Sequence, residues 1–236
     1  MARTPIWRSI ADTLKAEIAS DQYSPGDKLP TEAKLSARFG VNRHTVRRAL
    51  AQMAADGLVH ARRGAGVFVT AVPTDYPIGR RVRFHQNLRA AGRMPAKEIL
   101  SLETRSPNPD EAEALRLGAG EQVHAYEGLS LADGQPIAVF RSVFSAARFP
   151  DLVTQLAVRK SVTQALAECG LADYTRASTR LTAKRASATQ ALHLQVAEGA
   201  PILRTVAINV DADGDPVEFG HTWFAGDKVT LTLGEP

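Results

Sequence analysis

The residues with the most evident binding chemistry lie between positions 41 and 50, in the segment VNRHTVRRAL. Three arginines and one histidine fall within six consecutive positions of it. A guanidinium group can donate two hydrogen bonds to the O6 and N7 atoms of guanine, and an α-helix fits the major groove of DNA. The segment therefore predicts a helix that reads double-stranded DNA. Its candidate contacts are Arg43, His44, Thr45, Arg47 and Arg48.

Two earlier helices are expected to hold this recognition helix in position. The first carries apolar residues at helical spacing, and the second runs from Thr31 to the helix stop Gly40. Asn42 suits the N-cap of the recognition helix, whose buried stripe would leave the arginines exposed. The apolar positions are Ile6, Ile10, Leu14 and Ile18 in the first helix, Leu35 and Phe39 in the second, and Val46, Leu50 and Met53 in the third.

A β-hairpin is predicted after the recognition helix. In residues 58–69 (LVHARRGAGVFV) two β-prone runs flank the basic, glycine-rich sequence RRGAG. Such a tip is positively charged and can approach a phosphate backbone or a minor groove closely. Three helices followed by a hairpin are typical of a winged helix-turn-helix domain. The candidate contacts at the wing are Arg62, Arg63 and Gly64.

The distribution of charge favours a polyanionic partner for this region alone. Residues 1–72 contain eleven Lys and Arg against six Asp and Glu, whereas the rest of the chain contains eighteen against nineteen. The one cysteine, Cys169, cannot form an internal disulfide. No apolar run approaches the ~18 residues that a membrane span needs. We therefore expect a cytoplasmic protein without a membrane partner.

The C-terminal two thirds are expected to form a second domain. Two prolines in residues 71–77 (AVPTDYP) predict an extended connector. Strand-like runs joined by two Asp-Gly turn signals indicate consecutive hairpins, and hence an antiparallel sheet with helices to one side. The chain is therefore assigned to the α+β class. The expected boundaries are 1–71 for the DNA-binding domain, 72–79 for a linker and 80–236 for the second domain.

The residue pattern does not favour catalysis. The histidines outside the recognition helix are scattered without metal-ligand spacing, and neither a Cys–His pair, a Ser–His–Asp order nor a glycine-rich phosphate loop is evident. We therefore expect no catalytic residues, no metal and no cofactor.

The N-terminal third is similar to the GntR family of bacterial transcription regulators. The resemblance is carried by residues 26–32 (GDKLPTE), 41–50 and 63–69 (RGAGVFV), in that order. It implies that Arg43, Thr45 and Arg47 reach base edges or nearby phosphates. It also implies backbone contacts at the start of the second helix and at the wing. The residues concerned are Lys28 and Thr31 in the first place, and Arg62, Arg63 and Gly64 in the second.

The remainder resembles UTRA, the effector domain of the HutC branch of the GntR family, whose fold is similar to that of chorismate lyase. Residues 131–137 (LADGQPI), 213–219 (DGDPVEF) and 224–228 (FAGDK) carry this resemblance. A narrower one, to repressors of phosphonate-utilisation operons, is carried by residues 75–77 (DYP) and 83–88 (RFHQNL). UTRA domains bind small, often anionic metabolites.

The resemblance also implies where an effector would sit. Arg83 precedes a helix whose N-terminal amides would favour an anion, and Ser161 opens another. Arg176 and Arg180 are interpreted as surface or structural charges. The other residues that would face the ligand are Phe84, Thr163, Glu218 and Phe224.

The effector site is also expected to include Gly128, Ser130, Phe140 and Arg141, and the first three of these positions depart from the pattern of related sensors. Sugar-phosphate sensors carry two arginines where this chain has Gly128 and Ser130, which argues against a sugar phosphate bound in the usual way. Phe140 stands where relatives often carry Glu, and the adjacent Arg141 could supply a charge from another angle.

These observations together predict a homodimeric repressor of a phosphonate uptake or catabolism operon, which a small anionic metabolite releases from its operator DNA. Each head would read one half of a roughly palindromic site. Two alternatives stay open. The effector could be a different metabolite, such as a sugar phosphate or an amino-acid derivative, or the C-terminal domain could serve only to dimerise the protein.

Overall fold

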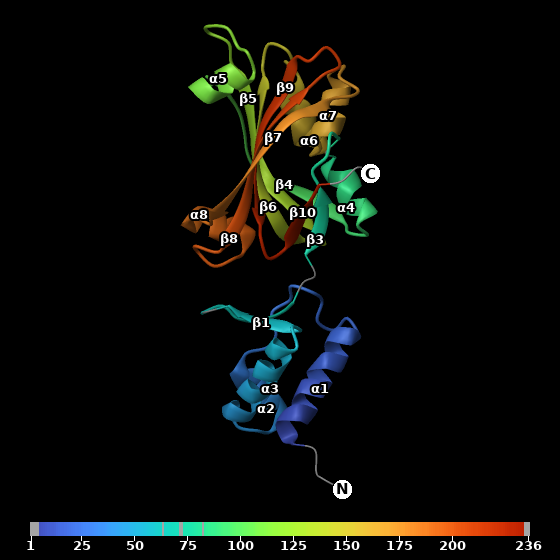
Figure 1. Ribbon diagram of the computed structural model, residues 1–236, viewed down its shortest axis with the longest axis vertical. Coiled ribbons are helices and arrows are strands. Elements are labelled where there is room, and N and C mark those ends of the chain that lie inside the picture. Colours follow the sequence, from blue (N-terminus) through green and yellow to red (C-terminus); the bar gives the residue numbers. More distant parts are fainter. Residues whose placement is uncertain (1–4, 63, 71–72, 82, 234–236) are drawn as a thin grey trace. The chain divides into compact units, whose positions relative to one another are not determined.

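The computed structural model divides the chain into two compact units, Met1–Val72 and Pro73–Pro236 (Figure 1). Each unit has a hydrophobic core of its own. The structure describes residues 5–62, 64–70, 73–81 and 83–233, and for Arg62 it describes the backbone alone.

The N-terminal unit is a winged helix-turn-helix, as predicted. Its apolar stripes meet in one cluster, in which Leu14, Leu35 and Met53 are fully buried. Ile6 was expected on the buried stripe, but its side chain is 63% exposed because it lies in the first turn of its helix, beyond the cluster. The elements are α1 (Ile6–Ala19), α2 (Glu32–Phe39), α3 (Arg43–Ala55) and the antiparallel hairpin of β1 (Val59–Arg62) and β2 (Gly66–Val69).

Local chemistry explains the sharp turn between α2 and α3. Gly40 ends α2 in the left-handed conformation, at φ 64°. Two residues later, Asn42 caps α3 by accepting a hydrogen bond of 2.9 Å from the backbone N–H of Thr45. The predicted cap residues are thus confirmed, and they fix the direction in which α3 leaves the turn.

The C-terminal unit is built on a six-stranded antiparallel sheet, in the order β4-β5-β6-β9-β8-β7. The Asp133-Gly134 turn joins β5 to β6 with positive φ at both residues, 49° and 75°, as a tight hairpin requires. A second hairpin joins β8 to β9. The strands are β4 (Pro95–Arg105), β5 (Val123–Ala132), β6 (Gln135–Ser145), β7 (Thr175–Arg185), β8 (Pro201–Val210) and β9 (Pro216–Ala225).

Helices cover both faces of this sheet, so the expectation of helices to one side was wrong. Phe140 and Ala138 point to one face, whereas Val139 and Val143 point to the other, because side chains alternate along a strand. The first pair packs with α4 (Phe84–Ala90), α6 (Leu152–Arg159) and α7 (Val162–Glu168). The second pair packs near α5 (Pro109–Ala114) and α8 (Ala188–Leu194), at opposite ends of the sheet (Figure 1).

The predicted linker contains a strand. Residues Thr74–Pro77 form β3, which pairs in parallel with β10 (Val229–Thr232) near the other end of the chain. The side chain of Tyr76 is buried there against Phe224. Residues 74–77 therefore belong to the C-terminal unit rather than to a free connector. The two prolines predicted extended backbone correctly, but they could not indicate a partner strand about 150 residues away.

Because the units have separate cores, we expect them to lose stability separately. Leu14→Ala should destabilise the N-terminal unit by about 2–5 kcal/mol, since it empties a fully buried site. Leu156→Ala is the matched substitution in the C-terminal unit. Each unit contains one of the two tryptophans, so the urea unfolding of each can be followed alone by fluorescence. Trp7 reports on the N-terminal unit when Trp223 is replaced by Phe, and Trp223 reports on the C-terminal unit when Trp7 is replaced. A loss at both reporters from one substitution would show that the units unfold together.

Candidate DNA-reading surface and ligand cavity

The exposed side of α3 presents Arg47 beside α2. Its guanidinium donates two hydrogen bonds to Glu32, of 3.1 Å from Nε and 2.8 Å from Nη2. These bonds lower the pKa of the Glu32 carboxyl, against a smaller opposing effect of burial. Arg47 remains exposed, so water competes with the pair and another polar partner can replace it. Arg43 and His44 are exposed on the same helix.

Arg48 is directed elsewhere. Its guanidinium carbon lies 4.8 Å from the centre of the Trp7 ring on α1, so Arg48 packs on the α1 side of α3, whereas Arg47 reaches toward α2. The hydroxyl of Thr45 is also engaged, because it donates to the Oδ1 atom of Asn42 at 3.0 Å. The predicted contacts on α3 therefore do not share one direction.

Lys28 is held next to the wing. The backbone at Lys28 bridges to Phe68 of β2, and the N–H of Leu29 donates to the carbonyl of Val67 at 2.9 Å. Gly66 has φ 119°, and a Cβ there would lie 2.7 Å from the Cε of Lys28. The positive φ favours glycine at this point, whereas the side chain of Lys28 could move away from a Cβ.

The remaining predicted contacts fall on turns. Thr31 caps α2 by accepting from the N–H of Lys34 at 3.3 Å, and Gly64 lies in the exposed turn of the wing at φ 75°. The predictions for the Arg62 side chain and for Arg63 lie outside the described residues. DNA contact by each of these residues stays a prediction.

A cavity of about 100 Å³ lies in the C-terminal unit, on the face of the sheet that packs against α4, α6 and α7. All of its lining residues come from the C-terminal unit. Seven of the ten predicted effector residues line it, because alternate residues of β5, β6 and β9 point to this face and the first residues of α4 and α7 border it. These seven are Phe84, Ser130, Phe140, Ser161, Thr163, Glu218 and Phe224.

The cavity also contains polar residues that the sequence analysis missed. Lys97 and Asn209 were not considered, and Arg176 was interpreted as a surface or structural charge, whereas all three line the cavity. The alternation of side chains along a strand could have indicated two of them. Lys97 falls on the same face of β4 as Ile99, and Asn209 falls on the same face of β8 as Ala207. The pattern does not say which face holds a cavity.

A row of hydrogen bonds crosses the floor of the cavity. Nε of Arg176 donates to Oδ1 of Asn209 at 3.0 Å, and Nδ2 of Asn209 donates to one oxygen of Glu218 at 2.7 Å. The hydroxyl of Ser142 donates to the other oxygen at 2.5 Å. Strand register produces this row, since Arg176 pairs with Asn209 and Asn209 with Glu218.

Lys97 is the second cation of the cavity. Its ammonium lies 3.9 Å from the centre of the Phe140 ring, a cation–π distance. It has no hydrogen-bond or ion-pair partner among the described residues. Burial lowers the pKa of Lys97 to about 8, and the negative charge of Glu218 opposes part of that shift. Lys97 is therefore mostly protonated at pH 7 but can lose its proton in mild base.

Arg83 does not line the cavity, contrary to the prediction. Its guanidinium donates to Asp173 at 3.0 Å and to the carbonyl of Tyr174 at 2.8 Å, and it lies 3.8 Å from the centre of the Tyr174 ring. Tyr174 itself lines the cavity and shares a hydrogen bond of 3.0 Å with Thr163. Arg83 thus supports the wall, and its charge is balanced by a carboxylate.

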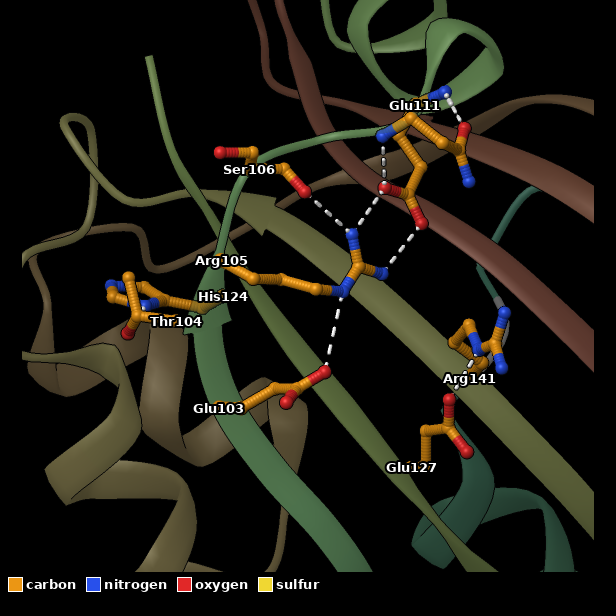
Figure 2. Close-up of polar contacts among 9 residues, drawn as sticks. Glu103, Thr104, Arg105, Ser106, Glu111, His124, Glu127 and Arg141 are labelled. Atoms are coloured by element: carbon orange, nitrogen blue, oxygen red, sulfur yellow. Dashed lines mark hydrogen bonds and ion pairs between the residues drawn. The ribbon is translucent and has the colours of Figure 1, made fainter. Parts of the chain in front are cut away.

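Arg141 and Gly128 are also absent from the lining. Figure 2 shows Arg141 directed at Glu127, with which it forms an ion pair on the opposite face of β5 and β6. Gly128 faces the cavity side, but the ring of Phe140 occupies the space that its side chain would need. A Cβ at Gly128 would lie 2.8 Å from the Phe140 ring and even closer to the backbone oxygen of Glu98. The first of the two arginines expected in sugar-phosphate sensors therefore has no room at position 128.

We predict that Gly128→Ala destabilises the C-terminal unit by about 1–3 kcal/mol, because the backbone of β4 cannot move away from the new methyl group. Urea unfolding followed at Trp223 measures this. Gly79→Ala is the control, since a Cβ there meets nothing and its φ is ordinary. Equal stability of the Gly128→Ala and Gly79→Ala proteins would show that β5 accepts a side chain at this position.

The part of the chain that the structure describes has no group of three metal-binding side chains. None of its helices is long and apolar enough to cross a membrane.

Comparisons with known proteins agree with the two-unit architecture. Residues 7–69 match the model of bacterial regulatory proteins of the gntR family, and residues 90–230 match the UTRA domain. A crystal structure of PhnF from Mycobacterium smegmatis superimposes with a TM-score of 0.65 at 22% identity, over 96% of this chain and 99% of that chain. This similarity supports the fold.

Two relatives extend the match to the whole chain. An uncharacterized HTH-type transcriptional regulator of Rhizobium meliloti is 38% identical, over 97% of this chain and 94% of its own length. The probable transcriptional regulator PhnF of Escherichia coli is 32% identical, over 96% and 94%. The chain therefore belongs to the GntR family of bacterial regulatory proteins, with a UTRA domain, and is a transcriptional regulator rather than an enzyme.

Proposed function

We propose that the protein is a repressor that binds operator DNA through α3 and the wing, and leaves it when a small anionic metabolite occupies the cavity. The observation that carries the ligand class is Lys97. Its ammonium faces the cavity without an acidic partner among the described residues, and an anion would supply one. Burial also makes the attraction between opposite charges stronger than it is in water.

The lining argues against a sugar phosphate bound as in related sensors, because a side chain at position 128 would meet Phe140 and the backbone of Glu98. Residues 75–77 and 83–88, which resemble repressors of phosphonate-utilisation operons, contribute Tyr76, Phe84 and His85 to the cavity wall. We therefore propose that the effector is a phosphonate and that the regulated genes serve phosphonate uptake or catabolism.

The connection between the units suggests how a ligand would act. β3 is the first strand after the wing, and its Tyr76 lines the cavity. A ligand that changes the packing of Tyr76 thus acts on the segment that leads to the DNA-binding unit. It lowers DNA affinity only if it binds more tightly to the arrangement that does not fit the operator. We further propose a homodimer whose heads read half-sites centred about 10 bp apart.

Arg47→Ala should weaken binding to the operator by about 1–3 kcal/mol, because Arg47 can exchange Glu32 for a base edge. The operator can be selected from random-sequence DNA with the wild-type protein, and affinity measured by fluorescence anisotropy at fixed salt. Arg48→Ala, one residue away, should cost less because its guanidinium lies over Trp7. An Arg47→Ala protein with wild-type affinity and sequence preference would remove Arg47 from base reading.

Lys97→Met should leave operator affinity unchanged and weaken the response to phosphonates at least tenfold. A panel of alkylphosphonates, aminoalkylphosphonates, sugar phosphates and amino acids is added to the protein–operator complex, and release of labelled DNA is recorded. Release by phosphonates supports the proposal. Release by another class alone would replace the effector, and release by none, together with no thermal shift, would favour a C-terminal unit that only dimerises.

The pH dependence of ligand affinity, compared between the wild type and Lys97→Met, tests whether the charge of Lys97 binds the anion. A bound anion raises the pKa of Lys97 above its value of about 8. The contribution of Lys97 to binding is therefore complete below pH 8 and is lost as the pH rises through the pKa of the complex. Wild-type affinity should fall between pH 8 and 9.5 more steeply than that of Lys97→Met, in which only the ligand titrates. Parallel pH profiles would show that Lys97 does not meet the anion.

A further inference from the structure

The charges in the cavity are of both signs. Among the described lining residues, Lys97 and Arg176 are cations and Glu218 is the carboxylate. Burial lowers the pKa of His85, so its imidazole adds no positive charge at neutral pH. An anion without any positive group would meet two attractive charges but also the repulsion of Glu218.

Hydrogen bonds hold the carboxylate of Glu218 in place, but they come from groups that carry no compensating charge. Its two oxygens accept hydrogen bonds from Ser142 and Asn209, which are neutral groups, and it forms no ion pair among the described residues. Arg176 is linked to it only through the amide of Asn209. A carboxylate has about four acceptor positions, so Glu218 keeps acceptor capacity beyond these two bonds.

The ammonium of Lys97 and the carboxylate of Glu218 come from different parts of the sheet. Lys97 lies on β4 and is held against Phe140, whereas Glu218 lies on β9 beside Asn209. The field of Glu218 nevertheless reaches Lys97, because it opposes the lowering of the Lys97 pKa by burial. Both residues also line the same cavity, so one ligand bound there can meet both groups.

We propose that the cavity selects a small zwitterion, with an anionic group bound by Lys97 and an ammonium group bound by Glu218. This inference rests on the proposed function, since it specifies the effector of the same cavity. The lining carries one positive charge in excess, which a ligand with a doubly ionised acid and one ammonium group compensates. Each charged group of the ligand then has a buried partner of opposite sign, as burial of charge requires.

The test uses matched ligand pairs in which a methyl group replaces the ammonium group. These are 2-aminoethylphosphonate against propylphosphonate, and taurine against propanesulfonate. Isothermal titration of the full-length protein should show at least tenfold tighter binding of the amino member of a pair. Lys97→Met should weaken both members of the pair.

Glu218→Gln keeps the shape of the side chain and removes its charge, so it should reduce the preference for the amino member to about twofold or less. Glu127→Gln is the matched control. Its carboxylate lies on the opposite face of the sheet with Arg141, and this variant should keep the wild-type preference. The comparison of ligands on the unaltered protein does not depend on how well Glu218→Gln folds.

The outcomes separate the two proposals. Equal binding of 2-aminoethylphosphonate and propylphosphonate would overturn the zwitterion and leave the phosphonate effector standing. Preference for taurine over propanesulfonate, with no phosphonate bound, would support the zwitterion and overturn the phosphonate. Tighter binding of the methyl members, or no binding by either pair, would overturn the zwitterion.

Discussion

The register of the strands β6, β9, β8 and β7 is the constraint on which the cavity depends. It aligns Arg176, Asn209 and Glu218 in one row and brings Ser142 to the same carboxylate. A slip of one residue along β9 would turn Glu218 to the other face of the sheet, because successive side chains alternate. Its hydrogen bonds would be lost and the cavity would have no acidic group.

Apolar residues on both faces hold this register. On the cavity face, Phe140 packs with α6 and α7, and Phe224 packs with β3 and β10. On the other face, Val139 and Val143 pack near α8 and α5. Phe140 and Phe224 also line the cavity, so these clusters form the apolar part of its wall.

The N-terminal unit likewise has an apolar core with its charged residues outside it. Leu14, Leu35 and Met53 fix α3 against the other helices. The arginines of α3 stay outside that core, and Arg47 is paired with an exposed carboxylate that a stronger partner can displace. In both units, buried apolar residues form the cores, and the charged residues proposed to bind DNA or ligand lie at the surface or face the cavity.

Local interactions explain why much of the architecture could be predicted. The cap Asn42, the helix stop Gly40 and the tight turn at Asp133 and Gly134 act on neighbouring residues, so their effect is visible in a short stretch of sequence. Apolar periodicity likewise indicated the three helices of the N-terminal unit, and strand-like runs with Asp-Gly turns indicated the hairpins of the sheet. Resemblance to a known domain added seven residues of the cavity lining, including Glu218 and Phe224.

The roles of individual charges were decided only by tertiary structure. Arg83 and Arg176 look alike in the sequence, yet Arg83 meets Asp173 outside the cavity and Arg176 meets Asn209 within it. The same holds for β3, whose partner strand lies about 150 residues away. The sequence by itself determined which segments fold and which face of each is apolar, because those properties depend on near neighbours. Which charges stay unpaired depends on the groups that distant segments bring beside them, and that is set by packing and strand register.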